Sequence, residues 1–313
     1  MDGVLVVDKP AGPTSHDVVD RARRALRERR IGHTGTLDPF ATGVLPLCVG
    51  RATRLARFLS GGEKVYRASV RLGFATTTDD RTGEPLSPPR PSDVAGEALG
   101  EALAAFVGTF DQVPPAFSAR HVGGRRLYEL ARNGEAAPRT ATPVTVQALD
   151  LVSREGDCLE LEVRCSAGTY VRAIARDLGE RLGTGGHLVA LRRTRSGAFD
   201  LSRAVPGDRL DASASAAIVP VRELLPELPS VRVGARGRSF VAHGRDLGPA
   251  DVDGPFPGPE HDVVRVIDDS GELVALASPR RFEPGASGLP RLEALHPDVV
   301  VVDGTGGGRP AQG

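Results

Sequence analysis

The 313-residue chain has no tryptophan, one methionine and only three cysteines. The cysteines, Cys48, Cys158 and Cys165, are odd in number and show no Cys-x-x-Cys spacing. Paired or closely spaced cysteines are the usual sign of a disulfide framework or a zinc site, so we expect neither here. The sequence also lacks a paired-histidine metal motif and the glycine-rich loops that bind nucleotides.

Long apolar runs are missing too. No stretch approaches the roughly 18 residues of a membrane span. The first residues, Met1-Asp2-Gly3-Val4, lack the basic start and apolar core of a secretion signal. Hydrophobic residues make up 40% of the chain and charged residues 26%, as in globular proteins. We therefore expect a cytoplasmic protein with one large domain and a smaller one.

Lysine is nearly absent, because only Lys9 and Lys64 occur among 40 basic residues. An ammonium is a compact point charge, whereas the arginine guanidinium is a planar fork, so the two are not interchangeable. Both lysines lie beside segments that carry candidate site residues. We interpret them as positions that need a compact charge, with chance placement as the alternative.

The formal net charge is zero, but the charge is unevenly distributed. Residues 1–60 hold ten basic and six acidic side chains, whereas residues 230–313 hold nine arginines and twelve acidic side chains. A phosphate-binding face needs local positive density rather than a basic average. The arginine-rich run 21–30 is therefore either such a face or an ordinary solvated helix face.

The most informative segment is Gly32-His33-Thr34-Gly35-Thr36-Leu37-Asp38-Pro39-Phe40-Ala41-Thr42-Gly43. Glycine and aspartate are poor formers of both helix and strand, so this composition predicts an ordered loop. Asp38 precedes a proline, which favours extended backbone and fixes the direction of its side chain. The loop thus presents one carboxylate and one imidazole. A purely structural Asp-Pro turn is the alternative.

Alternating and periodic patterns predict a mixture of strands and helices. The expected strands are 4–7, 65–72, 143–152, 159–165, a pair within 187–199, and a hairpin of 263–267 with 273–277. The expected helices begin at Thr14 or Ser15, at Glu97 (ending at Val107), and after Gly168-Thr169. Residues 84–93 and 249–261 are rich in proline or glycine and predict loops.

Asp38 is the leading candidate for chemistry, because a carboxylate on a rigid loop can attack an electrophilic carbon. In an apolar pocket it needs a neighbouring cation to stay ionised, and Arg172 is the best candidate. Asp80 could approach through the fold. Tyr66 and Tyr170 each offer a flat face for stacking on a base, with an ordinary core position as the alternative.

Seven segments, in order, resemble the tRNA pseudouridine synthase B (TruB) family, and they cover roughly residues 3–200. They are Asp8-Lys9-Pro10-Ala11-Gly12-Pro13-Thr14-Ser15, Gly32-His33-Thr34-Gly35-Thr36-Leu37-Asp38-Pro39, Lys64-Val65-Tyr66, the Thr/Asp run ending at Asp80, Pro114-Pro115-Ala116-Phe117-Ser118-Ala119, Gly168-Thr169-Tyr170-Val171-Arg172 and Leu191-Arg192-Arg193. The set is highly specific, although each segment alone is weak.

The resemblance implies an isomerase that converts uridine 55 of the tRNA T-loop into pseudouridine, without cofactor or metal. It implies that Asp38 is the nucleophile and Arg172 its ion-pair partner, and that Tyr66 stacks on the base and takes the proton from C5. The implied substrate-binding residues are His33, Tyr170, Leu191 and Asp80, and the implied supporting residues are Lys9, Pro10, Gly35 and Lys64.

The resemblance also implies an α+β fold with a mixed, largely antiparallel central sheet and flanking helices. Residues 1–228 would form this catalytic domain, residues 229–303 a small β-rich PUA-like module, and residues 304–313 a disordered tail. The partner would be the T-arm stem-loop of tRNA, bound by a monomer with no membrane or protein partner. The acidic character of residues 229–303 puts acceptor-stem contact by this module in doubt.

Two other functions remain open at this stage. One is a pseudouridine synthase that acts on another RNA. The other is an RNA-binding or tRNA-remodelling protein in which catalysis is secondary. A hydrolase with an aspartate nucleophile would need a second catalytic acid or a metal, and no motif for either is present.

Overall fold

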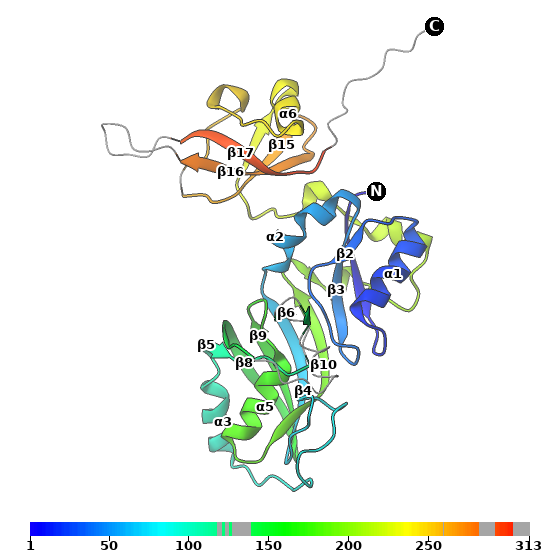
Figure 1. The fold of residues 1–313 in the computed structure, drawn as a ribbon, viewed down its shortest axis with the longest axis vertical. Helices are drawn as coiled ribbons and strands as arrows, with labels where there is room; N and C mark the ends of the chain where they lie inside the picture. Colours follow the sequence, from blue (N-terminus) through cyan, green and yellow to red (C-terminus); the bar gives the residue numbers. More distant parts are fainter. Residues whose placement is uncertain (118–120, 123–124, 127–138, 259, 282–291, 303–313) are drawn as a thin grey trace, which may run out of the picture.

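A computed structural model describes residues 1–117, 121–122, 125–126, 139–258, 260–281 and 292–302 (Figure 1). The expected disordered tail at 304–313 lies outside these residues. The largest element is an eleven-stranded sheet with the main order β12-β1-β3-β10-β4-β9-β8-β5. Two of its pairings, β1 with β12 and β3 with β10, are parallel, and the others are antiparallel. The expected mixed, largely antiparallel sheet is confirmed.

The predicted strands 4–7, 65–72, 143–152 and 159–165 are confirmed, and the pair expected within 187–199 is one long strand followed by a two-residue strand. The remaining strands of this sheet were not predicted. In chain order the strands of the sheet are β1 (Gly3–Lys9), β2 (Ile31–His33), β3 (Thr42–Val49), β4 (Lys64–Leu72), β5 (Gly108–Gln112), β8 (Thr142–Glu155), β9 (Cys158–Cys165), β10 (Gly186–Ser196), β11 (Phe199–Asp200), β12 (Val205–Pro206) and β13 (Val219–Pro220). Short strands β6 (His121–Val122) and β7 (Arg125–Arg126) form a separate pair.

Helix α1 (Ser15–Leu26) begins with a capping box, in which Thr14 accepts a hydrogen bond from the Asp17 amide and Asp17 accepts one from the Thr14 amide. The predicted start of this helix is confirmed. Short α2 (Ala56–Ser60) precedes β4, and α3 (Gly96–Ala104) ends three residues before the predicted Val107. None of the described helices is long and apolar enough to cross a membrane.

Helix α5 (Val171–Arg181) packs closely against β10 because glycines meet at the contact. A Cβ atom on Gly179 would lie 2.1 Å from the amide nitrogen of Gly186, so a larger side chain would separate the two elements. Gly185 has φ +71°, which returns the chain sharply from the helix into the strand. This close contact fixes the C-terminal half of α5 against the start of β10, and Arg172 lies in the first turn of the same helix.

The C-terminal part forms its own sheet with the order β14-β15-β16-β17 and a short helix (Figure 1). The elements are β14 (Ser230–Val233), α6 (Ala235–Ala242), β15 (Val264–Asp268), β16 (Leu273–Arg281) and β17 (Leu292–Val300). The expected β-rich module and its hairpin are therefore confirmed. Leu273 and Leu276 of β16 pack in one apolar cluster with Val4 and Val44, so the module shares core with the large sheet.

Candidate active site

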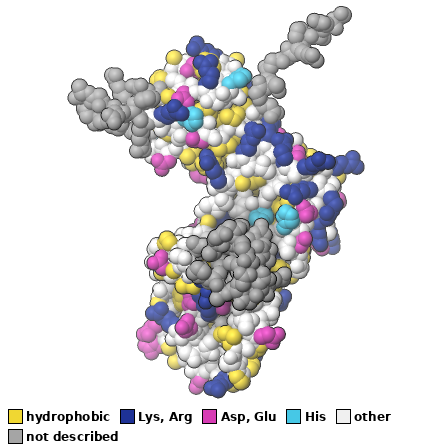
Figure 2. Space-filling model, viewed as in Figure 1, with side chains coloured by type: hydrophobic (Ala, Val, Ile, Leu, Met, Phe, Trp, Pro, Cys, Tyr) yellow, Lys and Arg dark blue, Asp and Glu magenta, His cyan; other side chains and the backbone are white. Residues whose placement is uncertain are grey.

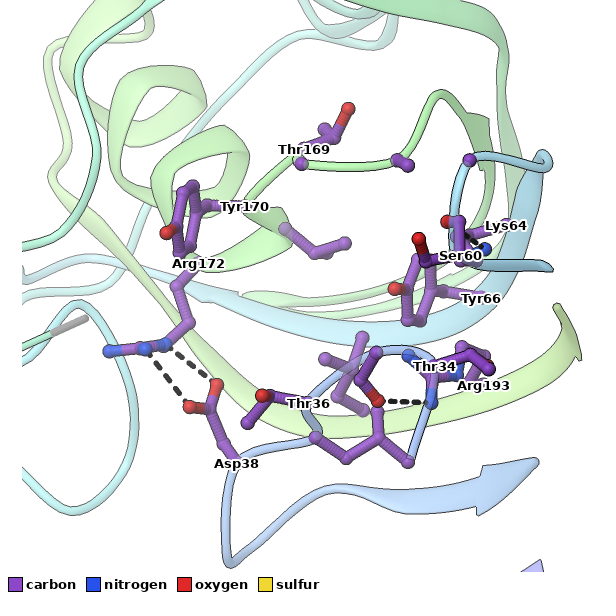
Figure 3. A pocket seen from close by; sticks show the side chains of 17 residues that line it. Thr34, Thr36, Asp38, Ser60, Lys64, Tyr66, Thr169, Tyr170, Arg172 and Arg193 are labelled. Atoms are coloured by element: carbon purple, nitrogen blue, oxygen red, sulfur yellow. Dashed lines mark hydrogen bonds and ion pairs between the residues drawn. The ribbon is translucent and has the colours of Figure 1, made fainter. Parts of the chain in front are cut away.

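A cavity of about 510 Å³ opens between the loop before β3, the start of β4, the start of α5 and β10 (Figure 3). Its size is in the usual range of sites for small ligands. Most of the predicted site residues line it, namely Gly35, Asp38, Lys64, Tyr66, Tyr170, Arg172 and Leu191. His33, Asp80, Lys9 and Pro10 are not part of its wall.

The structure brings Asp38 and Arg172 together, although they are 134 residues apart in the chain. Arg172 Nε lies 2.9 Å from Asp38 Oδ2, and Nη2 donates to Oδ1 at 3.0 Å (Figure 3). Such a two-point contact fixes the orientation of the carboxylate as well as its charge. Burial raises the pKa of Asp38, whereas the Arg172 guanidinium acts in the opposite direction and favours the carboxylate.

Asp80 lies on the other side of Arg172, with its Oδ2 3.6 Å from Nη1. Its Oδ1 accepts hydrogen bonds from the Thr78 hydroxyl at 2.8 Å and the Thr82 amide at 2.9 Å. Arg172 also donates to the backbone carbonyls of Thr78 (3.2 Å) and Phe117 (2.9 Å). We therefore interpret Asp80 as a residue that orients the arginine, which differs from the substrate contact that the resemblance implied.

Lys9 is fully buried and holds the Asp38 loop in place. Its ammonium donates to the carbonyls of Pro10 (3.0 Å), Pro39 (3.1 Å) and Ala41 (2.7 Å). Three carbonyls around one nitrogen match the three donors of lysine. Burial lowers the pKa of Lys9 to about 8. A single side chain thus ties the backbone just after Asp38 to the segment that follows β1.

A second anchor joins the Asp38 loop to α1. The Ser15 hydroxyl donates to the Leu37 carbonyl at 3.0 Å and accepts from the Leu37 amide at 2.8 Å. Ser15 is the first residue of α1, so the loop is fixed relative to that helix. The capping sequence before α1 therefore contributes to the site as well as to helix formation.

Arg193 is a site residue whose importance the sequence did not reveal. It is almost fully buried, lies opposite Tyr66 in the β4–β10 ladder, and donates to the carbonyls of Gly35 (3.0 Å) and Val44 (2.7 Å). Burial raises the pKa of the Tyr66 phenol, and the Arg193 charge counteracts part of that effect. The raised pKa favours a protonated hydroxyl.

Tyr170 occupies the residue before α5, at the Arg172 end of the cavity (Figure 3). The buried side chain of Gln112 forms two hydrogen bonds with the Tyr170 backbone. Tyr170 N donates to Gln112 Oε1 at 2.8 Å, and Gln112 Nε2 donates to the Tyr170 carbonyl at 3.1 Å. Gln112 therefore fixes where α5 begins. A single glutamine at the end of a strand gave no signal in the sequence.

His33 and Thr34 leave polar atoms without a hydrogen-bond partner among the described residues. These atoms are His33 Nδ1 and Thr34 Oγ1, and Thr34 lines the cavity. Burial lowers the pKa of His33, so its imidazole is neutral at pH 7. Unsatisfied buried polar atoms are rare in folded proteins, and beside a cavity they indicate groups that a ligand can satisfy.

Lys64 lies at the opposite end of the cavity from Arg172 (Figure 3). Its ammonium donates to the carbonyls of Ser60 (3.1 Å) and Gly62 (2.7 Å), and burial lowers its pKa to about 8. These contacts close the turn between α2 and β4.

We predict that Lys64→Arg lowers kcat/KM about tenfold, because a bulkier planar group in a filled site forces neighbouring backbone to move. Steady-state kinetics on the T-arm stem-loop that the resemblance implies as substrate measure this effect. Arg57→Lys, at an exposed position on α2, serves as the control for an arginine–lysine exchange and should leave the rate within twofold. Equal activity of Lys64→Arg and wild type would show that a compact charge is not required at this position.

The comparisons with known proteins agree with this geometry. A family model described as "TruB family pseudouridylate synthase (N terminal domain)" matches residues 23–171, and one described as "tRNA pseudouridylate synthase B C-terminal domain" matches residues 172–225. The chain belongs to the TruB family. The boundary between the two models falls within the first turn of α5, so residues from both segments of this TruB chain line the cavity.

Curated relatives extend the match over nearly the whole chain. A protein of Solibacter usitatus named "tRNA pseudouridine synthase B" is 45% identical over 307 residues, which is 96% of this chain and 100% of the relative. A protein of Leifsonia xyli with the same name is 46% identical over 88% of this chain and 91% of its own length. One of Gloeobacter violaceus is 49% identical over 82% and 89%, respectively.

Solved structures show the same fold. A chain from "Crystal Structure of a Cbf5-Nop10-Gar1 Complex" is 27% identical, with a TM-score of 0.72 over 96% of this TruB chain and 85% of that chain. A chain from an H/ACA RNP bound to a substrate RNA containing 2'-deoxyuridine is 26% identical, with a TM-score of 0.70 over 97% and 86%. The likeness covers the C-terminal sheet as well as the central one.

Proposed function

We propose that this protein isomerises uridine 55 in the T-loop of tRNA to pseudouridine. One observation carries the proposal: in a chain of the TruB family, a carboxylate held at two points by a buried arginine faces a cavity of nucleoside size. The names of the curated relatives support tRNA as the substrate. The roles of the individual residues are part of the proposal.

The reaction exchanges one bond at the ribose for another. The bond between C1′ and uracil N1 breaks, the base turns, and a bond forms between C1′ and C5. The proton on C5 is lost and N1 gains a proton, so atoms and charge balance. Asp38 is the nucleophile that faces the sugar, while Arg172 keeps it ionised and oriented. Leu191 and the ring of Tyr66 provide apolar walls for the detached base.

The target base must leave its stack before Asp38 can reach the sugar, which costs a few kcal/mol. Stacking on an aromatic side chain contributes about 1–3 kcal/mol per base and offsets much of that cost. Thr34 lines the same cavity, and its hydroxyl, which has no partner among the described residues, can pair with the displaced nucleotide. Such a site acts on a loop nucleotide more readily than on a paired one.

Release of tritium from uracil C5 tests the proposal, because isomerisation removes the hydrogen on C5. A T-arm stem-loop labelled at C5 should release tritium when incubated with the protein, whereas a stem-loop of equal length from another RNA should not. Efficient release from the other RNA and none from the T-arm would favour the alternative that the enzyme modifies a different RNA. No release from either would contradict the function.

The C-terminal end of α1 and the residues just after it carry a group of exposed arginines. Arg24, Arg27 and Arg29 line a shallow hollow there, and Figure 2 shows basic side chains concentrated over this part of the molecule. Because Ser15 fixes the start of α1 to the Asp38 loop, these arginines stand at a set distance from the site. RNA phosphates are the partner that such a surface fits.

Replacing Arg24, Arg27 and Arg29 together with Gln should weaken tRNA binding at least tenfold at moderate salt, with kcat at saturating tRNA unchanged. The slope of log Kd against log salt should fall by about one for each phosphate that the variant no longer binds. The control replaces Arg67, Arg71 and Arg164, which lie on the strands β4 and β9, away from the cavity wall. Equal effects of the two triple variants would refute a specific RNA contact at α1.

A further inference from the structure

Two arginines one turn apart on α5 pair with two consecutive aspartates. Arg172 contacts Asp80, and Arg176 Nη1 lies 2.9 Å from Asp79 Oδ2. The Arg176 and Asp79 side chains are 20% and 11% exposed, so this second pair is also largely removed from solvent. Residues i and i+4 share one face of a helix, which explains how both arginines reach the same turn.

Arg176 also contacts segment 113–117, which accepts a hydrogen bond from Arg172 as well. Its Nη2 donates to the Val113 carbonyl at 3.1 Å, and Arg172 donates to the Phe117 carbonyl of the same segment. The turn around Asp79 and the segment 113–117 are thus each fastened to α5 at two points. In each case one point is Arg172 and the other is Arg176.

Asp79 forms its ion pair with Arg176 although its backbone conformation is unfavourable. Asp79 has φ +61°, in the left-handed region that only glycine adopts easily, and it is buried. Such a conformation is unfavourable in a non-glycine residue, because the Cβ atom crowds the backbone. In extended backbone, neighbouring side chains point to opposite faces, whereas here two consecutive carboxylates both reach α5. The Asp79 carbonyl also accepts a hydrogen bond from the Leu188 amide at 3.0 Å, which joins the turn to β10.

We propose that Asp79 and Arg176 are positioning residues, which hold the turn and the segment that orient Arg172 toward Asp38. The inference rests on the proposed function, because it concerns the arginine of that same site. Without the second pair, the turn can shift relative to α5, and Asp80 and the Thr78 carbonyl then no longer keep a set distance to the Arg172 guanidinium. A misplacement of about 1 Å in a catalytic group can lower a rate by about 100-fold.

Asp79→Asn is the sharpest test, because asparagine has the same shape and tolerates the left-handed backbone but carries no charge. We expect kcat to fall about 10- to 100-fold, with the Kd for tRNA within twofold of wild type. Asp2→Asn is the matched control, because Asp2 also forms a two-point pair, with Arg51 Nε at 3.0 Å and Nη2 at 2.7 Å, at a distance from the cavity. The control should lower thermal stability by a similar amount without changing kcat.

Asp79→Gly separates the charge from the backbone strain, since glycine adopts φ +61° without cost. If the pair positions Arg172, the glycine variant is as slow as the asparagine variant. Recovery of the full rate with glycine would show that Asp79 serves only the turn geometry and would overturn the proposal. Arg176→Lys, which keeps the charge near Asp79, should retain more activity than Arg176→Gln.

The dependence of kcat on pH gives a readout that a purely structural role would not move. The charged groups that face Asp38 are Arg172 from α5, Asp80 from the turn, and Lys9 from β1. Burial and the Asp80 charge raise the pKa of Asp38, and an Arg172 that is held less firmly lowers it less. The acidic limb of the profile should therefore move to higher pH in Asp79→Asn. A wild-type protein without activity would refute the proposed function itself. An active wild type with an Asp79→Asn profile equal to that of Asp2→Asn would refute only the positioning role.

Discussion

Asp38→Asn will abolish pseudouridine formation and leave tRNA binding nearly unchanged. Asparagine has the same shape and keeps one oxygen for Arg172, but an amide is not a nucleophile at the ribose. Loss of a nucleophile commonly lowers kcat on the order of 10⁴-fold or more. Tritium release under single-turnover conditions measures the chemical step, and filter binding measures the Kd.

The chain offers a close control for this variant. Asp8 is held by Arg192 at two points, at 3.0 and 2.7 Å, and is 33% exposed, against 32% for Asp38. Asp8→Asn therefore makes the same chemical change in a two-point ion pair outside the cavity, with an arginine that is 41% exposed where Arg172 is 6% exposed. Its rate should stay within threefold of wild type. An Asp38→Asn variant that retains a tenth of the wild-type rate would exclude Asp38 as the nucleophile and favour an RNA-binding protein with secondary catalysis.

Arg172→Gln will have the next largest effect, with kcat lowered on the order of 10³-fold. The substitution leaves two carboxylates, Asp38 and Asp80, close together in a buried site without their shared cation. Removing one partner of a buried pair is strongly destabilising, by about 3–5 kcal/mol, because the remaining charge is uncompensated. Thermal unfolding of the variant should therefore occur at a lower temperature, and rates should be compared below that transition.

The pH dependence of the Arg172→Gln variant has a definite sign. Burial and the Asp80 charge raise the pKa of Asp38, whereas Arg172 lowers it. Without Arg172 the pKa rises further, so the reactive carboxylate forms only at higher pH. The acidic limb of the rate profile should shift upward relative to wild type, and Arg172→Lys should shift it less. An unchanged limb would show that Arg172 does not control the ionisation of Asp38.

Much of the fold could be predicted from the sequence because its strands alternate and its helices are amphipathic. The apolar and polar alternation of 65–72 predicted β4 almost residue by residue, and the Thr14 cap predicted the start of α1. The unusual composition of residues 32–43 indicated the site loop. Its pairing with Arg172 could not be read from spacing, since it depends on how α5 lies on the sheet. The need of a buried carboxylate for a cation suggested Arg172, and the resemblance to a known family implied the same pair.

The residues that sequence reasoning missed are those whose role depends on burial. Arg193 lies in a run with Arg192 and Arg195 that has the composition of a solvent-exposed strand face. It is buried because β3 and β10 pair closely at Gly43, where a Cβ atom would lie 2.1 Å from the Arg193 carbonyl oxygen. Gln112 gave no local signal either. Tertiary contact, and not local pattern, decides which polar side chains support the site.

The C-terminal module changes how RNA binding should be tested. Deleting residues 229–313 would remove Leu273 and Leu276 from the apolar cluster that they share with residues of the large sheet, so the truncated protein would expose apolar core. Loss of binding in such a variant would not separate RNA contact from instability. Substitutions of exposed arginines, with the apolar contact left intact, avoid this problem.

Mapping of pseudouridine in a full-length, unmodified tRNA transcript after incubation with the purified protein tests the central claim most directly. The account predicts one new pseudouridine, at position 55, approaching one per tRNA with wild-type protein and absent with Asp38→Asn. A tRNA in which uridine 55 stays unchanged, or in which the same yield appears with Asp38→Asn, would contradict it.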